Sequence, residues 1–385
     1  MNIVIYDTEH FETTYTLIQI LDIPQNKITV FTTVTMEPVL KEMLAENAHR
    51  YVWLTSKKSS LRFVFTIYNY CKRENVSHLF LNTVSYHHIY FGVLCFILKR
   101  TKSILTVHNT NNFFNPILKF RFRNIMQFLG KKVLASTVST FATLLQSTKQ
   151  YIHEVIERRK PIIILPGSVY DKKINENAIR KSHLSLVVSG SVDQYRRDYD
   201  QVFELALELE KKQVATEIIL LGSASGEQGK KIISKCLATK FQFVNLKAYT
   251  SDFVSVTEYE SKFHQCDFIF QPLQKIYHKP NEQPEEYGLT SCSGAFFDAV
   301  RFAKAVLLPA NIHLTAELVN QCIPYQSIPE LAEFLKNLTG NQYTYLLHKA
   351  ERNSLNFSVD IVREYLFIEL NIKERRANQP KIYSP

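Results

Sequence analysis

Glycine is scarce in this sequence, and its few copies are unevenly placed. Only 10 of the 385 residues are glycine, and eight of these lie at or after Gly167. A loop that cradles phosphate groups needs glycine where the backbone approaches its ligand closely. Neither the GxxxxGK[ST] pattern of a P-loop nor the GxGxxG pattern of a dinucleotide-binding loop occurs. Any nucleotide site is therefore expected in the C-terminal half.

Long apolar runs and paired cysteines are also missing. The longest apolar run, residues 89–98, is too short to span a bilayer and is typical of a buried helix. The six cysteines are scattered, with no CxxC pair, which favours reduced thiols in a cytoplasmic protein. No signal peptide is expected, because the first residues resemble a strand and lack a basic stretch and cleavage site. Hydrophobic residues make up 45% of the chain, enough for sizeable cores.

Acidic residues are absent from a long stretch of the N-terminal half, between Glu74 and Glu154. Residues 1–170 hold 20 Lys+Arg against 10 Asp+Glu, whereas residues 171–385 hold 26 of each, so the first part carries the whole net charge of +10. The basic residues inside the acid-free stretch are Lys99, Arg100, Lys102, Lys119, Arg121, Arg123, Lys131, Lys132 and Lys149. Such a field attracts nucleic acid, anionic lipid or a phosphate-bearing substrate.

Apolar, strand-like stretches alternate with amphipathic ones along the whole chain. The expected strands are 2–7, 27–33, 50–56, 77–83, 103–109, 132–137 and one within 160–171, then 184–192, 217–222, 241–247, 266–273 and 305–310. Amphipathic segments include 59–73, 109–132, 141–157, 198–212 and 359–370. Alternation of this kind predicts parallel sheets covered by helices on both faces. We expect two doubly wound α/β domains, 1–165 and 175–350, and a C-terminal helical segment, 355–375.

Two stretches of the C-terminal half repeat the order strand, small polar loop, helix. The first strand ends at Gly190, and Arg196 and Arg197 follow at the start of a helix. Helix N-termini favour anions and a guanidinium binds phosphate through two N–H groups, so this pair suits a diphosphate. An arginine pair at a helix start is also often simply solvated. The second stretch ends its strand at Gly222 and continues into a flexible loop.

A third such stretch, residues 285–309, is the richest in polar groups. Ser291, Ser293 and Gly294 lead into a helix, where their N–H and hydroxyl groups could hold phosphate oxygens. Asp298 lies one turn further, where its carboxylate could accept hydrogen bonds from ribose hydroxyls. Alternatively, Asp298 is only a first-turn acid favoured by the helix dipole.

With these three stretches, the C-terminal half resembles the donor domain of the GT-B glycosyltransferases, in particular the large retaining bacterial family (glycosyl transferases group 1). In "FDAVRFAKAVLLP", Asp298 stands for the second Glu of the family's Glu-x7-Glu motif and Ala303 for its usual Gly. Arg197 matches a phosphate-binding basic residue, and Gly222 matches a strand-end Gly. "VHN", which contains His108, is similar to an acceptor-domain motif. Thr290 occupies the position of the first Glu, and the nearest acids, Glu282, Glu285 and Glu286, lie upstream.

The resemblance implies two Rossmann-like domains facing a cleft and a retaining, metal-independent transfer of a sugar from a nucleotide-diphosphate sugar to a glycan. The glycan is expected to be lipid-linked, in the synthesis of bacterial O-antigen, capsule or exopolysaccharide. The implied donor-binding residues are Gly190, Arg196, Arg197, Gly222, Ser291, Ser293, Gly294 and Asp298. Glu285 or Glu286 would approach the donor sugar, and His108, or less plausibly His10, would face the acceptor. No metal is expected, because the DxD at 198–200 opens a helix and its two acids point apart.

The basic N-terminal half adds an expected partner, the anionic inner face of a membrane, with no nucleic acid. Three other readings stay open at this point. One is a nucleotide-sugar 2-epimerase on the same scaffold, which would have no need of a basic acceptor half. Another is a non-catalytic protein that binds membrane or nucleic acid, since "LKFRFRNIMQF" interleaves aromatic and basic residues. The last is a transferase-like subunit without activity, as the missing first Glu would allow.

Overall fold

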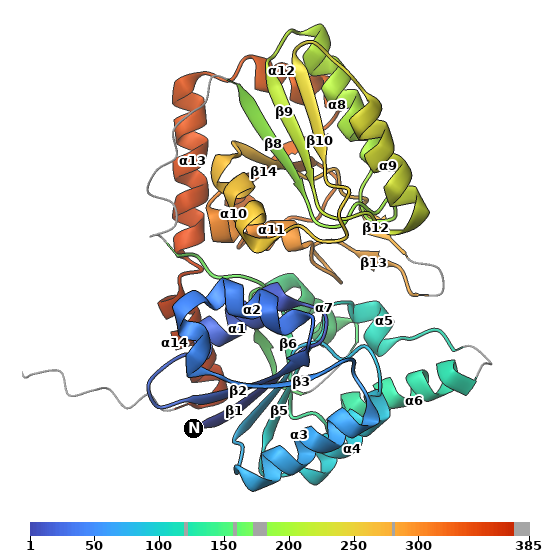
Figure 1. The fold of residues 1–385 in the computed structure, drawn as a ribbon, viewed down its shortest axis with the longest axis vertical. Coiled ribbons are helices and arrows are strands. Elements are labelled where there is room, and N and C mark those ends of the chain that lie inside the picture. The colour runs from blue at the N-terminus through green and yellow to red at the C-terminus, as the bar shows by residue number, and fades with distance from the viewer. Residues whose placement is uncertain (119–121, 157–159, 172–182, 279–281, 373–385) are drawn as a thin grey trace, which may run out of the picture.

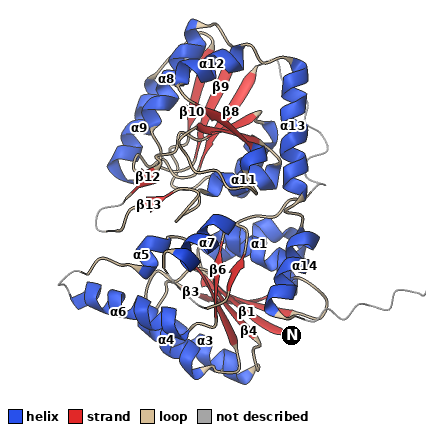
Figure 2. Ribbon diagram, turned by 180° about the vertical axis from the view of Figure 1, so that it is seen from behind, coloured by secondary structure: helices blue, strands red, loops and turns tan. Residues whose placement is uncertain are grey.

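The chain folds into two α/β domains stacked one above the other, here described from a computed structural model (Figure 1). The structure describes residues 1–118, 122–156, 160–171, 183–278 and 282–372. One sheet holds seven strands and the other six, and every neighbouring pair within them is parallel. Helices cover both faces of each sheet, as Figure 2 shows from behind. The predicted fold class, two doubly wound domains, is therefore confirmed.

The first sheet has the order β3-β2-β1-β4-β5-β6-β7. Its strands are β1 (Asn2–Tyr6), β2 (Lys27–Thr33), β3 (Val52–Ser56), β4 (His78–Leu81), β5 (Lys102–Thr106), β6 (Thr140–Thr143) and β7 (Ile162–Ile164). Its helices are α1 (Phe11–Leu21), α2 (Met36–Leu44), α3 (Leu61–Arg73), α4 (His88–Ile97), α5 (Thr110–Phe114), α6 (Phe122–Thr137) and α7 (Gln146–Glu154), with a 3-10 turn at Ala45–Arg50. Because successive side chains of a strand point to opposite faces, Ile3 and Ile5 pack with α1 and α2, whereas Val4 and Tyr6 pack with α3, α4 and α6.

The second sheet has the order β10-β9-β8-β11-β14-β15. Its strands are β8 (Leu184–Ser189), β9 (Thr216–Leu221), β10 (Val244–Ala248), β11 (Phe268–Phe270), β14 (Ala305–Pro309) and β15 (Cys322–Tyr325), and a short antiparallel pair, β12 (Ile276–Tyr277) and β13 (Glu285–Glu286), lies apart. The helices are α8 (Tyr199–Lys211), α9 (Gly226–Ala238), α10 (Val256–Gln265), α11 (Gly294–Phe302), α12 (Ile328–Lys336) and α13 (Gly340–Leu355), with a 3-10 turn at Val319–Gln321. Strand order reverses direction beside β1 and again beside β8, and such switch points are where α/β sheets bind ligands, at the carboxyl ends of the strands.

The C-terminal part of the chain returns to the first domain. Helix α13 runs along the second domain, and α14 (Val359–Leu370) lies against the first (Figure 1). Val362, Leu366 and Phe367 of α14 are buried in the same cluster as Ile3 and Ile5 of β1. The core of the first domain is therefore built from residues near both ends of the described chain.

Several segments differ from the sequence-based expectation. Residues 132–137 form the last turns of α6 rather than a strand, and the strand at this place is β6, which begins three residues after the helix ends. The segment 141–157 was expected as one helix, but its first residues belong to β6 and α7 begins only at Gln146; residue 157 lies outside the described residues. The amphipathic segment 109–132 is likewise interrupted: Leu118 lies outside the described helices, and Lys119 and Arg121 lie outside the described residues.

Candidate active site in the cleft between the domains

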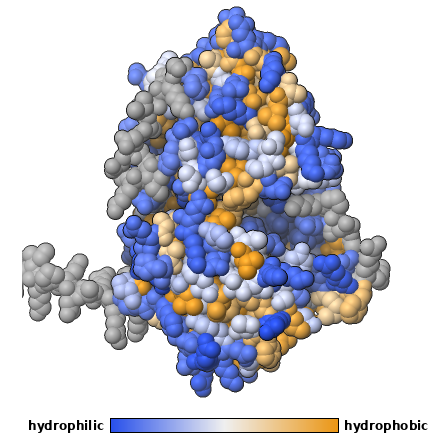
Figure 3. Space-filling view, in the orientation of Figure 1, coloured by the Kyte–Doolittle hydropathy of each residue, from blue (hydrophilic) through white to orange (hydrophobic). Residues whose placement is uncertain are grey.

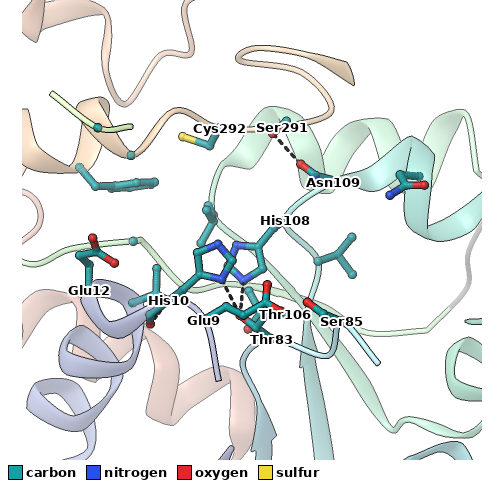
Figure 4. A pocket seen from close by; sticks show the side chains of 18 of the residues that line it. Glu9, His10, Glu12, Thr83, Ser85, Thr106, His108, Asn109, Ser291 and Cys292 are labelled. Carbon is teal, nitrogen blue, oxygen red and sulfur yellow. Dashed lines mark hydrogen bonds between the residues drawn. The ribbon is translucent and has the colours of Figure 1, made fainter. Parts of the chain in front are cut away.

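A cavity of about 660 Å³ lies between the two domains. Its walls come from the carboxyl ends of strands in both sheets, including the segments that follow β1, β4, β5 and β8, and from the N-terminal part of α11. The two switch points therefore face each other across one cavity, part of which Figure 4 shows. Of the site candidates named from the sequence, those that line it are His10, His108, Gly190, Arg196, Arg197, Glu282, Ser291, Gly294 and Asp298.

The segment after β8 places two guanidinium groups on this cavity. Arg197 is almost fully buried: its Nε donates to Gln271 Oε1 at 2.8 Å and its Nη1 to the Ser191 carbonyl at 3.1 Å. Arg196 lies over the ring of Tyr277, 5.5 Å from the centroid. Its Nε is buried without a hydrogen-bond partner in the described part of the chain, with the nearest carboxylate, on Asp193, 3.8 Å away. A guanidinium carries N–H donors on Nη1 and Nη2 besides the one on Nε, so the two arginines together suit an anion at this corner.

The glycines at this corner have different functions. Gly190 has a φ of +90°, and a Cβ there would lie 2.7 Å from Arg197 Nη2, so only glycine leaves room for that guanidinium. Gly222 does not line the cavity. A Cβ on Gly222 would lie 2.2 Å from the Gly190 carbonyl oxygen, which shows that this glycine permits the ends of β8 and β9 to approach each other. The predicted contact of Gly222 with a ligand is therefore not direct in this structure.

The start of α11 forms the opposite wall. Ser291 Oγ donates to Asn109 Oδ1 of the first domain at 3.1 Å, a contact visible in Figure 4. Ser293 lies behind the wall, with a buried Oγ that has no hydrogen-bond partner among the described residues, while Gly294 is exposed and open to the cavity. Asp298 Oδ2 accepts from the Tyr259 hydroxyl at 2.9 Å. Burial raises the pKa of Asp298 to about 6, so its carboxyl is mostly ionised at neutral pH.

Two stacked imidazoles, His10 and His108, lie on the first-domain side with their centroids 4.5 Å apart (Figure 4). His10 Nδ1 lies 2.8 Å from Thr83 Oγ1, and the Thr83 hydroxyl also lies 3.2 Å from Asp7 Oδ2. His108 Nε2 lies 2.8 Å from the Asn82 carbonyl and therefore carries a proton, which leaves Nδ1 as the acceptor. Burial and the neighbouring His10 lower the pKa of His108 to about 4. His108 is thus neutral at pH 7, suited to orienting a hydroxyl and weak as a base.

Glu285 and Glu286, predicted to approach the donor sugar, do not line the cavity. The carboxylate of Glu285 accepts from the backbone N–H of Asn111 at 3.2 Å and of Asn112 at 2.8 Å, so it caps α5 of the first domain. Glu286 Oε1 lies 3.7 Å from Lys275 Nζ. Both acids are therefore engaged elsewhere in this structure.

The two domains are held together by hydrogen bonds around Asn109, here called the interdomain latch. Asn109 Oδ1 accepts from the Tyr277 hydroxyl at 2.9 Å as well as from Ser291, and the N–H of Thr110 donates to the Thr290 carbonyl at 3.0 Å. The cap formed by Glu285 adjoins these contacts. Thr290, at the position of the family's first Glu, is therefore covered by the first domain.

The structure adds residues that the sequence analysis missed. Glu12, in the first turn of α1, lines the cavity opposite Asp298, and confinement in the cleft raises its pKa to about 7. Arg301 also lines the cavity, lies 5.2 Å from the centroid of Tyr15 across the cleft and pairs with Glu260. Arg301 was detectable, because it lies three residues after Asp298 on the same helical face. Glu12 was not, since nothing in its local sequence indicates which segment of the second domain it faces.

The two acids of the DxD stretch, Asp198 and Asp200, have separate structural contacts at the start of helix α8. Asp198 is its N-cap and accepts from the N–H of Asp200, while Asp200 Oδ1 lies 3.7 Å from Lys235 Nζ. In the part of the chain that the structure describes, no three side chains of His, Cys, Asp or Glu are grouped as they would be to hold a metal ion. No described helix is long and apolar enough to cross a membrane.

Known proteins resemble this chain in three-dimensional structure but not detectably in sequence. No family model matches the sequence, and no curated protein matches it. A glycosyltransferase from Rickettsia africae superimposes with a TM-score of 0.61 at 11% identity, over 96% of this chain and 98% of the other. The N-terminal domain of the Candida albicans trehalose-6-phosphate phosphatase gives 0.60 at 10% identity, over 96% of both chains.

A third solved structure is the UDP-GlcNAc 2-epimerase from Neisseria meningitidis bound to UDP-GlcNAc. It gives a TM-score of 0.55 at 10% identity, over 97% of this chain and 100% of the other. At identities this low, the superpositions establish the fold of the chain alone. Any function must be argued from the residues of the site. The protein has the GT-B fold: two Rossmann-like domains that face each other across a cleft.

Proposed function

We propose that this protein is a glycosyltransferase that moves a sugar from a nucleotide-diphosphate sugar to a glycan acceptor. The observation that carries the proposal is the corner formed by Gly190, Arg196 and Arg197, where two arginines line the cavity and Arg196 Nε has no hydrogen-bond partner among the described residues. Two cations beside the N-terminal part of α8 suit a diphosphate, and they could neutralise the leaving group without a metal. Solved structures of the same fold include glycosyltransferases, such as the one from Rickettsia africae.

In this proposal the second domain holds the donor and the first holds the acceptor. The diphosphate would contact Arg196, Arg197 and the N-terminus of α11 around Ser293 and Gly294, and Asp298 would accept hydrogen bonds from ribose. His108 would orient the acceptor hydroxyl through Nδ1. The acceptor would be a lipid-linked glycan at the inner face of a membrane, in bacterial surface-polysaccharide synthesis. The family resemblance implies that the transfer retains the configuration of the sugar. An acid other than Glu285 and Glu286 would then have to face the donor sugar, and Glu12 and Asp298 are candidates because they line the cavity.

Calorimetric titration with UDP, GDP, ADP and CMP, without added metal, tests the donor site. We expect one of the diphosphates to bind, and Arg196→Ala and Asp298→Asn each to weaken it about tenfold or more, since a hydrogen bond to a charged group contributes roughly 1.5–3 kcal/mol. Arg352→Ala and Asp252→Asn are matched controls at exposed positions and should bind like the wild type. Binding of none of the four nucleotides, or equal losses in the controls, would contradict the proposal.

A 2-epimerase is the second candidate, favoured by the likeness to UDP-GlcNAc 2-epimerase structures along nearly the whole chain. The two candidates differ in their need for an acceptor. Incubation with UDP-GlcNAc alone, followed by NMR of the sugar nucleotide, would show inversion at C2 for an epimerase. A glycosyltransferase without an acceptor would leave the configuration at C2 unchanged.

A further inference from the structure

Helices α4 and α6 of the first domain pack unusually close together. A Cβ on Gly130 of α6 would lie 2.7 Å from the backbone nitrogen of Ile89, and a Cβ on Gly92 of α4 would lie 3.0 Å from that of Leu134. Glycines at both contacts allow the two backbones to approach, so the helices form a single two-helix surface.

This two-helix surface exposes a group of large apolar side chains to solvent. On α4, Tyr90, Val93 and Ile97 recur at the spacing of one helical face, and Phe96 is 60% exposed beside them. On α6, Phe122 is 80% exposed and Leu129 follows two turns later. The apolar run 89–98, expected to be a buried helix, is therefore a helix with one open side. Apolar side chains also reach the surface of the first domain in the view of Figure 3. We call the exposed residues of these two helices the α4–α6 face.

The charges that these two helices and their flanking residues carry all have one sign. Lys99, Arg100, Arg123 and Lys132 are exposed, and the acid-free stretch from residue 75 to 153 contains both helices. Three cations lie over aromatic rings: Lys99 is 5.4 Å from the centroid of Phe96, Lys132 is 5.4 Å from that of Phe128, and Arg123 is 5.9 Å from that of Tyr86. Aromatic rings and cations side by side, next to aliphatic groups, suit the boundary between lipid headgroups and acyl chains.

We propose that the α4–α6 face docks on the surface of an anionic lipid bilayer. A bilayer supplies an apolar phase for Phe96 and Phe122 together with negative headgroups for the cations around them. A protein partner fits less well, because the centres of protein interfaces are depleted in charge, whereas cations here lie over three of the aromatic rings. The surface carries this proposal whether or not the chain is a transferase.

The same face adjoins the cavity. Tyr86, beside the start of α4, and Gln127, on α6, line the cavity, and Lys131 does so one turn further along. Lys131 is buried and donates from Nζ to the Asn112 carbonyl at 2.8 Å. A docked bilayer would thus lie beside the acceptor end of the cleft. This consequence rests on the proposed function, and it explains how an acceptor anchored in lipid could reach His108.

Cosedimentation of the full chain with vesicles tests the docking. We expect binding to phosphatidylcholine vesicles that contain phosphatidylglycerol and little binding to phosphatidylcholine alone. Phe96→Ser with Phe122→Ser should lower the partition coefficient about tenfold. Lys99→Glu with Lys132→Glu should lower it at least about tenfold and remove most of its salt dependence.

Two pairs of exposed residues elsewhere in the molecule are matched controls. Tyr345→Ser with Ile368→Ser replaces side chains that are 66% and 67% exposed, and Lys240→Glu with Lys336→Glu reverses two exposed charges of the second domain. Both should bind vesicles like the wild type, and thermal unfolding should show all four variants folded. The proposal fails if the wild type ignores anionic vesicles, if the controls lose as much as the tests, or if single-stranded nucleic acid binds in place of vesicles. Nucleotide titration of the same variants, expected to be unchanged, separates this failure from failure of the proposed function.

Discussion

At the scale of single residues, Glu285 joins the two domains through a carboxyl group that is almost fully enclosed. Only 2% of the residue is exposed, and its carboxylate accepts two backbone hydrogen bonds from α5. Burial penalises the charged form and outweighs those bonds, which raises the pKa of Glu285 to about 7 from its ordinary value near 4.5. The folded protein therefore holds a proton here that the unfolded chain has lost between these two pH values.

The raised pKa of Glu285 predicts how the stability of the protein depends on pH. Because the folded pKa is raised, the contribution of Glu285 to the free energy of unfolding is largest below about pH 4.5 and is lost as pH rises through about 7, with an upper bound of about 3 kcal/mol. Urea unfolding at several pH values should show this fall in the wild type and a flatter profile in Glu285→Gln. Glu286→Gln is the matched control and should keep the wild-type profile. A Glu285→Gln profile as steep as the wild type would assign the pH dependence to other groups.

Sequence patterns found some of the candidate site and not the rest. Arg197 and Asp298 were predictable because each follows a strand and a small polar loop in its own local sequence, so the strand order alone brings them to the cleft. The interdomain partners of Asn109 and Glu285 were not predictable. Asn109 accepts from Tyr277 and Ser291 of the second domain, and Glu285 accepts from the backbone of α5 in the first. These contacts depend on how the domains are placed, which no local periodicity encodes.

At the scale of elements, the junction of β8 and β9 depends on a pair of glycines. The backbone after β9 passes so near the carbonyl of Gly190 that Gly222 has no room for a side chain. This approach also fixes the turn that carries Arg197 toward the cavity. The two loops therefore behave as one structural unit below the predicted diphosphate position.

Replacing this glycine should damage both stability and binding. A methyl group in Gly222→Ala would meet backbone atoms, which cannot rotate away, so we expect a loss of about 2 kcal/mol or more in the free energy of unfolding. Gly294→Ala is the matched control, because a Cβ there meets nothing within 4 Å. Its stability should change by less than about 0.5 kcal/mol. Equal stability of the two variants in urea titrations would show that the loops separate at little cost.

Elements with one clear periodicity were predicted well. The limits of β2 and α14 agree with the predicted segments 27–33 and 359–370. The prediction of a strand at 132–137 was wrong. "KVLAST" holds two β-branched residues, Val133 and Thr137, but its true context is the end of a long helix packed on α4. Tertiary packing there overrides the local secondary-structure propensity. Gly130 permits that packing, although in the sequence a glycine at this place indicates a possible end of the helix.

At the scale of the whole molecule, the interdomain latch joins the two domains across the cleft. Its acceptor, Asn109 Oδ1, takes hydrogen bonds from Tyr277 and Ser291, both of which line the cavity. A donor substrate that contacted Ser291 would compete with Asn109 for the same hydroxyl. We therefore expect binding of such a donor to weaken the latch.

Weakening the latch should open the molecule. Asn109→Ala combined with Glu285→Gln removes at least two hydrogen bonds between domains, at about 1 kcal/mol each, and should raise the radius of gyration measured by X-ray scattering. Asn115→Ala, an exposed neighbour, is the control and should scatter like the wild type. An unchanged radius in the double variant would mean that other contacts, such as Phe11 against Phe253, suffice for closure.

The return of α14 to the first domain also sets the order in which the protein can be completed during synthesis. β1 leaves the ribosome first, yet the apolar groups that cover Ile3 and Ile5 include Leu366 and Phe367. At about 5–20 residues per second, the first sheet waits on the order of ten seconds with part of one face uncovered. The second domain has meanwhile emerged and can fold. The first domain to be made is thus the last to be finished, and a chaperone that shields nascent apolar surface would find its binding site there.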